Sequence, residues 1–205
     1  FKIIEDASHA IGASYKGQAV GCGTYSDITV FSFHPVKIIT TGEGGMATTN
    51  QANLYEKMVL LRSHGITRDE SSLLKISDGP WYYEQHTLGF NYRLTELQGA
   101  LGLSQLSRLD EFIELRKTIA NYYLTTLSDL PIELPLVNGC CQSSWHLFII
   151  KLKLDKIHKT HKQIFVELQE LGLGVNLHYI HIYRQPYYQS MGFNFDYCHN
   201  ADDYY

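Results

Sequence analysis

The sequence predicts an α/β fold in two units, a larger one over residues 1–115 and a smaller α+β one over residues 116–205. Short apolar runs separated by glycines fill the first fifty residues, as in strands joined by tight turns. From residue 95 onward, apolar residues recur at helical spacing instead. The length of 205 residues suffices for one large domain or two modest ones.

Three strands are expected in the larger unit, at residues 1–4, 28–33 and 46–49, where apolar and β-branched residues cluster. Glycines at 21–23 and 42–45 separate these runs and predict tight turns. The alternation of short strand-like runs with turns is the basis for placing a sheet in this unit.

Helices and a long loop are expected to follow the strands. Residues 50–53 predict the start of a helix, because apolar side chains recur on one face over the next two turns or so. Residues 62–90 are polar and poorly periodic, which predicts a long loop of functional or mobile character. A long helix is then expected over residues 95–127, bent near Ser107 or Asp110.

The smaller unit begins after a proline-bearing linker at residues 131–139. A strand is expected at 145–152 and an amphipathic helix at 159–171. Glycines within residues 172–174 predict the end of that helix. Neither unit shows an internal repeat.

Composition indicates a folded protein and argues against nucleic acid as a partner. Hydrophobic residues make up 44% and charged residues 19%, which is ordinary globular usage. The net charge is −4, and no Lys/Arg run resembles a footprint for the phosphate backbone of nucleic acid.

Cysteine usage and hydropathy favour a cytoplasmic protein without a membrane partner. The four cysteines form no CxxC pair and no disulfide framework. No apolar run approaches the roughly 18 residues that cross a bilayer. Because the chain opens at Phe1 in a strand-like run with no turn or cap before it, we expect it to be part of a longer protein.

Lys37 is the strongest candidate for chemistry. It ends the run FSFHPVK, just past an expected strand, and TTGEGG follows shortly after it. The carboxyl edge of a sheet is where α/β folds bind ligands. A lysine there can attack a carbonyl once it has lost its proton, which burial or a nearby positive charge favours. Taken alone, a lysine in this position is more often a solvated turn residue.

Asp6 is a candidate for the same site as Lys37. It lies in the run IIEDASHA, directly after apolar residues, and needs a cationic partner if it is buried. Pyridoxal chemistry pairs a Schiff-base lysine with an aspartate on the protonated ring nitrogen, which keeps the ring an electron sink. The alternative for Asp6 alone is a helix N-cap. Lys37 and Asp6 together favour the pyridoxal interpretation.

Three motifs in order make the sequence similar to a known family. They are EDASHA, FSFHPVK with TTGEGG, and GFNYRLTELQGALG. The pattern resembles the DegT-type sugar aminotransferases of the fold-type-I pyridoxal-phosphate enzymes, over nearly the whole chain. SSWHLF and LHY also resemble the C-terminal domain of that family. The resemblance implies an incomplete large domain with a mixed sheet, followed by a smaller, truncated α+β domain.

The resemblance implies pyridoxal 5′-phosphate as the cofactor. Lys37 carries the cofactor as a Schiff base and moves protons in this interpretation, while Asp6 holds the pyridinium nitrogen. His9 lies near the ring hydroxyl or the ring face. Ser32, five residues before the lysine, hydrogen-bonds the cofactor phosphate.

A second chain is implied by the GFNYR motif. In the family its asparagine reaches the phosphate in the neighbouring subunit, so Asn91, with Arg93 beside it, is expected to complete a site shared across a homodimer. Taken alone, Asn91 is more simply a turn residue before a helix.

Four residues are candidates for substrate binding. His178 and Tyr179 resemble the family's loop that approaches the sugar nucleotide. Glu43 and His34 are weaker candidates because they lie beside the lysine in the sequence. Each of the four could equally be an ordinary loop residue.

No metal site is expected, although the chain has ten histidines. The pairs His158/His161 and His178/His181 have the spacing of two ligands. Metal sites need three or four converging ligands, and neither pair has a matching set elsewhere.

The implied reaction moves an amino group from L-glutamate to C4 of a nucleotide-linked 4-keto-6-deoxy sugar. HPVKIITTGEGG resembles most closely the branch that makes the 4-amino UDP-sugar precursor of pseudaminic acid. Related branches make perosamine or 4-amino-4-deoxyarabinose, and some relatives without the lysine perform dehydration. A non-catalytic relative that binds a sugar nucleotide or a protein would also carry these motifs, as would a fragment without a working site. The combination of Lys37, Asp6 and Ser32 favours transamination.

Overall fold

The computed structural model describes residues 1–193 and 198–204. The chain divides into two compact units, the first formed by Phe1–Tyr123 with Leu136–Phe148 and the second by Leu124–Pro135 with Ile149–Tyr205. Residues 136–148 thus return to the first unit after the chain has left it. The domain limits 1–115 and 116–205 stay a prediction.

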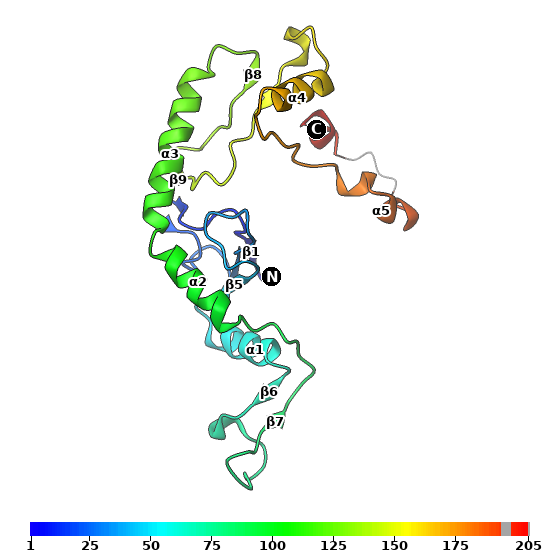
Figure 1. The fold of residues 1–205 in the computed structure, drawn as a ribbon. Coiled ribbons are helices and arrows are strands. Elements are labelled where there is room, and N and C mark those ends of the chain that lie inside the picture. Colours follow the sequence, from blue (N-terminus) through cyan, green and yellow to red (C-terminus); the bar gives the residue numbers. More distant parts are fainter. Residues whose placement is uncertain (194–197, 205) are drawn as a thin grey trace. The chain divides into compact units, whose positions relative to one another are not determined.

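A three-stranded mixed sheet forms the centre of unit 1 (Figure 1), with the strands in the order β1 (Ile4–Asp6), β4 (Ile28–Ser32), β5 (Gly45–Thr48). β1 runs parallel to β4, with Asp6 opposite Val30, and β4 runs antiparallel to β5. The predicted strands at 28–33 and 46–49 are confirmed to within one residue at each end. The strand predicted at residues 1–4 begins only at Ile4, which places Asp6 inside it.

Asp27 explains the shifted start of β1. Its carboxylate accepts hydrogen bonds from the Ile3 amide (2.8 Å), the Lys2 ammonium (2.9 Å) and the Gln51 side-chain amide (2.5 Å). The amide of Ile3 is therefore engaged by a side chain instead of a neighbouring strand. The Ile3 bond, followed by those from Gln51 and Lys2, holds the pKa of the Asp27 carboxyl well below its usual range.

The hydrophobic core lies between this sheet and the start of a long helix. Ala7, Phe31, Phe33 and Ile39 are buried, and partly buried side chains pack against them: Ala10, Ile11, Val20, Leu109, Phe112. Phe31 and Phe33 come from β4 and the residue after it, so the strand that leads to the lysine loop is anchored on the core. Burying such side chains contributes roughly 1.5–3 kcal/mol each.

A second sheet brings residues 136–148 into unit 1. Its strands lie in the order β3 (Gln18–Ala19), β2 (Ser14–Tyr15), β9 (Cys141–Gln142). Cys141 pairs with Tyr15 in antiparallel register, and the Lys16 amide donates to the Cys140 carbonyl (2.7 Å).

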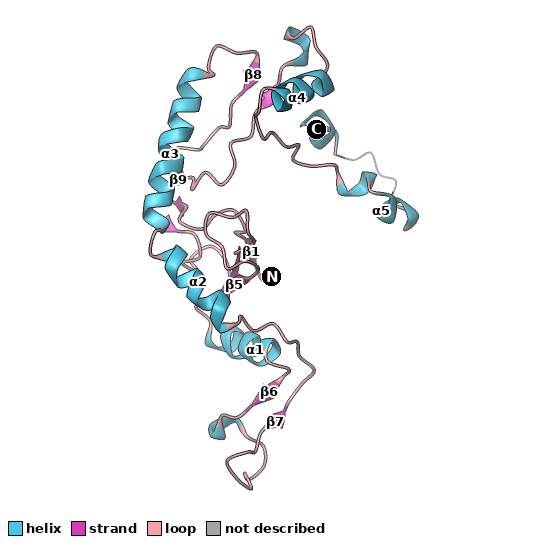
Figure 2. Cartoon of the chain, in the orientation of Figure 1, coloured by secondary structure: helices cyan, strands magenta, loops and turns pink. Residues whose placement is uncertain are grey.

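Three helices belong to unit 1 wholly or in large part: α1 (Ala52–Arg62), α2 (Glu96–Leu106), α3 (Leu109–Thr126). The bend predicted near Ser107 is a break between α2 and α3, which Figure 2 shows as two successive helices. Thr95 and Gln98 form a reciprocal capping box, which fixes where α2 begins. Gly102 of α2 lies close to Thr41, since a Cβ at Gly102 would approach Thr41 Cγ2 to 2.8 Å.

The predicted loop at 62–90 contains a small hairpin of β6 (Ile66–Thr67) and β7 (Glu84–Gln85), with a 3₁₀ turn, η1 (Glu70–Ser72), between them. Glu84 anchors this loop through hydrogen bonds. Its carboxylate accepts from the Leu74 and Lys75 amides (2.7 and 2.8 Å) and from the Tyr82 hydroxyl, and it pairs with His86 (2.8 Å). The Leu74 amide and His86 lead the causes that lower the pKa of Glu84 to about 2.

Unit 2 pairs β8 (Ile132–Glu133) with β10 (Lys151–Leu152) and carries short helices, namely η2 (Leu154–Lys156), α4 (His161–Glu170), η3 (Ile182–Arg184), α5 (Pro186–Ser190), α6 (His199–Tyr204). The predicted helix at 159–171 is confirmed as α4, which Thr160 caps. The left-handed Gly172 (φ 84°) follows its end. In the part of the chain that the structure describes, no helix has both the length and the apolar character needed to cross a membrane.

The strand predicted at 145–152 is wrong for residues 145–150. Trp145 has φ 51°, in the left-handed region, and no strand can pass through such a residue. The Arg116 guanidinium donates to the carbonyls of Trp145 (3.1 Å) and His146 (3.3 Å), so a side chain occupies acceptors that a neighbouring strand would use. Only Lys151–Leu152 pairs as β10.

Candidate functional site

Lys37 lies on a loop whose base is closed by backbone hydrogen bonds. The Phe33 amide donates to the Gly44 carbonyl (2.9 Å), and the Thr41 amide donates back to the Phe33 carbonyl (3.0 Å). Within the loop, the Lys37 amide donates to the His34 carbonyl (2.9 Å), which closes a turn. The sequence therefore presents Lys37 on a defined turn just beyond β4.

Buried neighbours hold the lysine loop against the core. Ile38 and Ile39 are 5% and 3% exposed, whereas Val36 on the other side of Lys37 is exposed. Thr40 donates its hydroxyl to the Phe33 carbonyl (3.0 Å) and accepts from the Gly42 amide (2.9 Å). Lys37 itself is half-buried, with its backbone fixed on both sides.

Asp6 sits at the end of β1 with one carboxylate oxygen engaged. Oδ1 accepts from the Ser8 hydroxyl (2.5 Å) and the Ser8 amide (3.0 Å). These two bonds are the main reason that the pKa of Asp6 is lowered, and the charges of His9 and Lys37 lower it further. Among the described residues no hydrogen bond reaches Oδ2. Asp6 is thus an exposed carboxylate at the end of β1, and not the N-cap of a helix.

Asp6 and Ser32 lie on the same face of the sheet. Asp6 pairs with Val30, and Ser32 follows two residues later on β4, so their side chains point to the same side. Ile4 and Val30 on this face are 68% and 37% exposed, so the described residues leave it largely open. The Ser32 hydroxyl accepts from the His34 amide at 3.4 Å, which directs it toward the lysine loop.

His9 follows Asp6 on an exposed turn, and its ring lies 4.3 Å from the ring of His146 (centroid to centroid). Its charge is among the causes that lower the pKa of Asp6. His9 and Lys37 thus both act on the Asp6 carboxylate, and Ser32 lies on the same face of the sheet as Asp6.

Asn91 and Arg93 lie in the segment that leads into α2. Both are exposed, and Asn91 forms an isolated antiparallel bridge with Ser63 at the end of α1. The residues that follow them lie against the lysine loop, since the Gln98 side-chain amide donates to the Glu43 carbonyl (2.9 Å) and a Cβ at Gly44 would approach Leu94 Cδ1 to 3.0 Å. The role of Asn91 and Arg93 toward another chain stays a prediction.

The four substrate candidates fall into two groups. His34 and Glu43 lie on the lysine loop, where His34 Nε2 and Glu43 Oε1 are 3.9 Å apart. His178 is half-buried and Tyr179 is 65% exposed, and both belong to unit 2. The roles of all four stay predictions.

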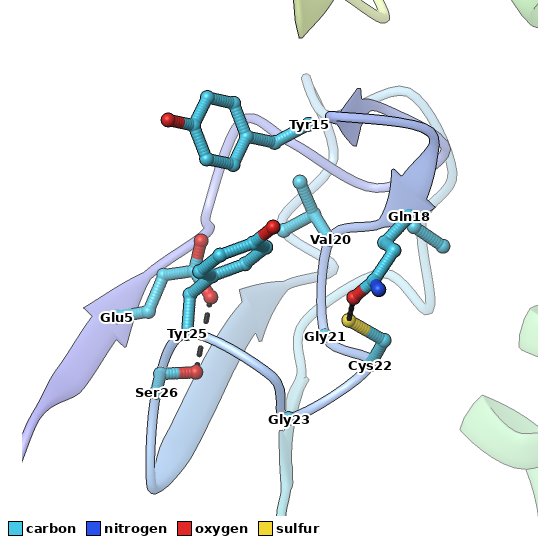
Figure 3. A pocket seen from close by; sticks show the side chains of 10 residues that line it. Glu5, Tyr15, Gln18, Val20, Gly21, Cys22, Gly23, Tyr25 and Ser26 are labelled. Carbon is cyan, nitrogen blue, oxygen red and sulfur yellow. Dashed lines mark hydrogen bonds between the residues drawn. The ribbon is translucent and has the colours of Figure 1, made fainter.

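A separate pocket of about 150 Å³ lies beside the β2–β3 hairpin (Figure 3), and it is lined by Glu5, Tyr15, Gln18, Ala19, Val20, Gly21, Cys22, Gly23, Tyr25 and Ser26. Glu5 directly precedes Asp6 in β1 and therefore points to the opposite face. Its Oε2 accepts from the Ser26 and Thr29 hydroxyls (3.2 and 3.0 Å). No predicted site residue lines this pocket, so this cavity is separate from the predicted site.

Several neighbours of the site were not predicted from the sequence. Ser8 is the main partner of Asp6, and an Asp-x-Ser spacing could have indicated this turn. Ser144 and His146 contact His9 from 135 and 137 positions away, and no local pattern could have predicted these contacts. Over residues 1–193 and 198–202, no group of three or more His, Cys, Asp or Glu side chains could hold a metal ion.

Residues 1–205 match the model of the DegT/DnrJ/EryC1/StrS aminotransferase family. The chain is 37% identical over 204 residues to the UDP-4-amino-4,6-dideoxy-N-acetyl-β-L-altrosamine transaminase of Campylobacter jejuni subsp. jejuni serotype O:2. That match covers 99% of this chain and 51% of the relative.

Solved structures give the same result. Helicobacter pylori PseC, described as an aminotransferase involved in the biosynthesis of pseudoaminic acid, matches with a TM-score of 0.86 at 35% identity, over 100% of this chain and 52% of that one. Spr1654 from Streptococcus pneumoniae matches in its PLP-form (TM-score 0.79, 30% identity, 93% and 47% covered) and its PMP-form (0.81, 30%, 97% and 48%). The chain therefore spans about half the length of these relatives. The predicted fold, that of fold-type-I pyridoxal-phosphate-dependent transferases, is confirmed.

Replacing Ser8 tests the electrostatics of Asp6. Ser8→Ala removes the hydroxyl that donates at 2.5 Å, so the pKa of Asp6 should rise toward 3.8. A lowered carboxyl pKa stabilises the fold above the unfolded pKa, and this contribution is lost as the pH falls through the folded pKa. Ser8→Ala should therefore retain less of this stabilisation at neutral pH. A ¹³C NMR titration of the Asp6 carboxyl measures the shift.

Ser71→Ala is the matched control, because Ser71 binds Asp69 through its hydroxyl and amide in the same way. That change should raise the pKa of Asp69 and leave Asp6 alone. Identical Asp6 titrations in the wild type and in Ser8→Ala would contradict the assignment of Ser8 as its main partner.

Proposed function

The chain belongs to the DegT/DnrJ/EryC1/StrS aminotransferase family, and on that premise we propose that the whole protein is a pyridoxal-phosphate-dependent sugar-nucleotide aminotransferase. One observation carries the proposal. A carboxylate (Asp6) and a hydroxyl (Ser32) share an open sheet face, and Lys37 lies on the closed loop just beyond the strand that carries the hydroxyl. A pure binding protein needs no such lysine.

The residues present fit pyridoxal phosphate. Asp6 keeps Oδ2 available for a protonated ring nitrogen, and its lowered pKa keeps the carboxylate charged at neutral pH. Ser32 lies on the same face and offers a hydroxyl to a phosphate, and His9 lies beside Asp6. When bound, the cofactor supplies an electron sink that stabilises negative charge on the carbon that loses its proton.

Lys37 is the residue proposed to move protons. Its Nζ can take a proton from the donor carbon and pass it to another atom only if the side chain comes back to the same position each time. The closed loop base and the buried Ile38 and Ile39 fix its backbone, while the half-buried side chain keeps its own rotatable bonds. The backbone of Lys37 is thus fixed, while its side chain can still rotate about its own bonds.

The proposed acceptor is a UDP-linked 4-keto-6-deoxy-N-acetylhexosamine, aminated at C4 with L-glutamate as the donor, as in the pseudaminic acid pathway. The name of the Campylobacter jejuni relative and the description of Helicobacter pylori PseC support this choice. His34 and Glu43 on the lysine loop, with His178 and Tyr179, are the proposed substrate contacts. The free thiols of Cys22, Cys140, Cys141 and Cys198 are compatible with a cytoplasmic reaction.

The proposal includes a homodimer with shared sites. Asn91 and Arg93 are exposed on the segment before α2, where a second chain can reach them. An asparagine amide and an arginine are both suited to a phosphate group. Each site would then take Lys37, Asp6 and Ser32 from one chain and Asn91 from its partner.

Borohydride reduction tests the cofactor and the lysine together. The whole protein is incubated with pyridoxal phosphate and reduced, and its peptides are mapped by mass. We expect a pyridoxyl adduct on the Lys37 peptide that is lost when glutamate precedes the reduction. Lys37→Ala should lower transamination by at least about 10²-fold, the usual contribution of a positioned acid–base group. Lys75→Ala, in an exposed loop, is the control. Adducts scattered over surface lysines would refute the proposal.

Steady-state assays with different nucleotide sugars test the acceptor. With glutamate as donor, kcat/KM for the UDP-linked 4-keto-6-deoxy-N-acetylhexosamine should exceed that for GDP- or dTDP-linked 4-ketosugars by at least about tenfold. Faster turnover of a GDP-linked sugar would favour a perosamine-type enzyme instead. Equal rates on all three would leave the aminotransferase proposal intact and remove the pathway assignment.

Mixing variants tests the shared site. Asn91→Ala and Lys37→Ala chains, each with little activity alone, should recover about a quarter of wild-type activity when mixed at random, since half the dimers then hold one intact site of two. Lys37→Ala mixed with Ser32→Ala is the control and should show no recovery, because both residues come from the same chain. Equal recovery in both mixtures, or in neither, would contradict sharing through Asn91.

A further inference from the structure

His9 is contacted by a segment that lies far away in the sequence. The Ser144 side chain is 1% exposed, and its hydroxyl donates to the His9 carbonyl at 3.3 Å. The His146 ring faces the His9 ring at 4.3 Å between centroids, with the planes tilted by 55°. One contact fixes the backbone of His9 and the other its ring, so together they restrict where the imidazole can go.

The contacting segment is itself held in place. The Arg116 guanidinium of α3 donates to the carbonyls of Trp145 and His146, and the Ser143 hydroxyl accepts from the Trp145 amide (3.0 Å). The Trp145 ring stacks on Phe148, which meets Tyr123 edge-on. These contacts maintain Trp145 in the left-handed region, which is costly for a bulky residue. A segment fixed in this way can serve as a rigid support.

The two histidines differ in exposure. His9 is exposed on the turn after β1, whereas His146 is half-buried and its Nδ1 is shielded from solvent. His146 is thus the more buried ring that packs against His9, and His9 is the ring that faces solvent. His9 follows Asp6 by three residues on the turn after β1, and its charge is among the causes that lower the pKa of Asp6.

We infer that His146 and Ser144 are positioning residues that hold the His9 imidazole beside Asp6, with Arg116 fixing the segment that carries them. The placement of His9 follows from the contacts alone. Its consequence for cofactor binding rests on the proposed function. Without the His146 ring, the His9 side chain can adopt more rotamers, and its ring nitrogens no longer point in a fixed direction.

Histidine-selective NMR of the cofactor-free protein tests the positioning directly. His146→Ala should shift the ring resonances of His9 and broaden or average them, whereas His146→Phe, which keeps a ring of similar shape, should largely restore them. Ser144→Ala should shift the His9 carbonyl with a smaller effect on the ring. Phe148→Leu is the matched control, because it loosens the packing of Trp145 in the same segment but leaves the His146 ring in place, and it should change the His9 ring much less than His146→Ala does.

The cofactor-loaded protein provides the second readout. His146→Ala should alter the visible circular dichroism of bound pyridoxal phosphate and lower kcat by roughly 10- to 100-fold with a much smaller change in KM. His146→Phe should recover part of kcat, and Phe148→Leu should not reproduce the loss.

The outcomes separate this inference from the proposed function. If the wild type binds no pyridoxal phosphate, the proposed function fails while the NMR result still decides the positioning. His9 resonances that are the same in the wild type and in His146→Ala, with both proteins folded by far-ultraviolet circular dichroism, would overturn the inference. Effects of equal size in Phe148→Leu would overturn it as well, since they would arise from general loosening of the segment.

Discussion

Asp6 and Ser32 share a face of the sheet because β1 pairs in parallel with β4 in one register, Asp6 opposite Val30. A slip of one residue would turn Asp6 to the other face, where Glu5 now lies, since side chains alternate along a strand. The register is held from the start of β1 by Asp27, which binds the Ile3 amide, and from the end by the Ala7 amide, which donates to the Val30 carbonyl (2.8 Å). The chemistry of the site thus depends on how a three-residue strand is anchored.

Local patterns in the sequence were sufficient for the parts of the fold that short-range hydrogen bonds determine. The strand at 28–33, the glycine turn before β5 and the start of a helix near residue 95 follow from apolar runs, glycine and helical spacing, and all are present. The lysine loop is of the same kind, since its closing bonds join residues no more than eleven positions apart. The motif around Lys37 could therefore be interpreted without a structure.

Long-range contacts account for what the sequence did not reveal. Residues 145–150 are apolar enough to predict a strand, but the Arg116 guanidinium and the left-handed Trp145 impose an irregular path. The first strand is displaced because a side chain, Asp27, takes the amide of Ile3. In each case a polar side chain competes with a neighbouring strand for backbone groups, and hydrophobic periodicity carries no information about that competition. The contact between the His9 and His146 rings could not be predicted either, because the two residues lie 137 positions apart and share no local pattern.

Glu5 and Asp6 show why an acidic residue alone does not mark the site. They are adjacent in β1, yet Glu5 Oε2 accepts from two hydroxyls beside a small pocket, while the described partners of Asp6 bind only Oδ1. Hydrogen bonds alone do not separate the two residues, because each carboxylate has described partners on one oxygen only. The sheet face separates them: Asp6 lies on the open face that also carries Ser32, whereas Glu5 lies beside the pocket on the opposite face. The charges of His9 and Lys37 also lower the pKa of Asp6, so its carboxylate is suited to a protonated ring nitrogen. Strand alternation thus makes Asp6, and not Glu5, the carboxylate on which a cofactor site can be built.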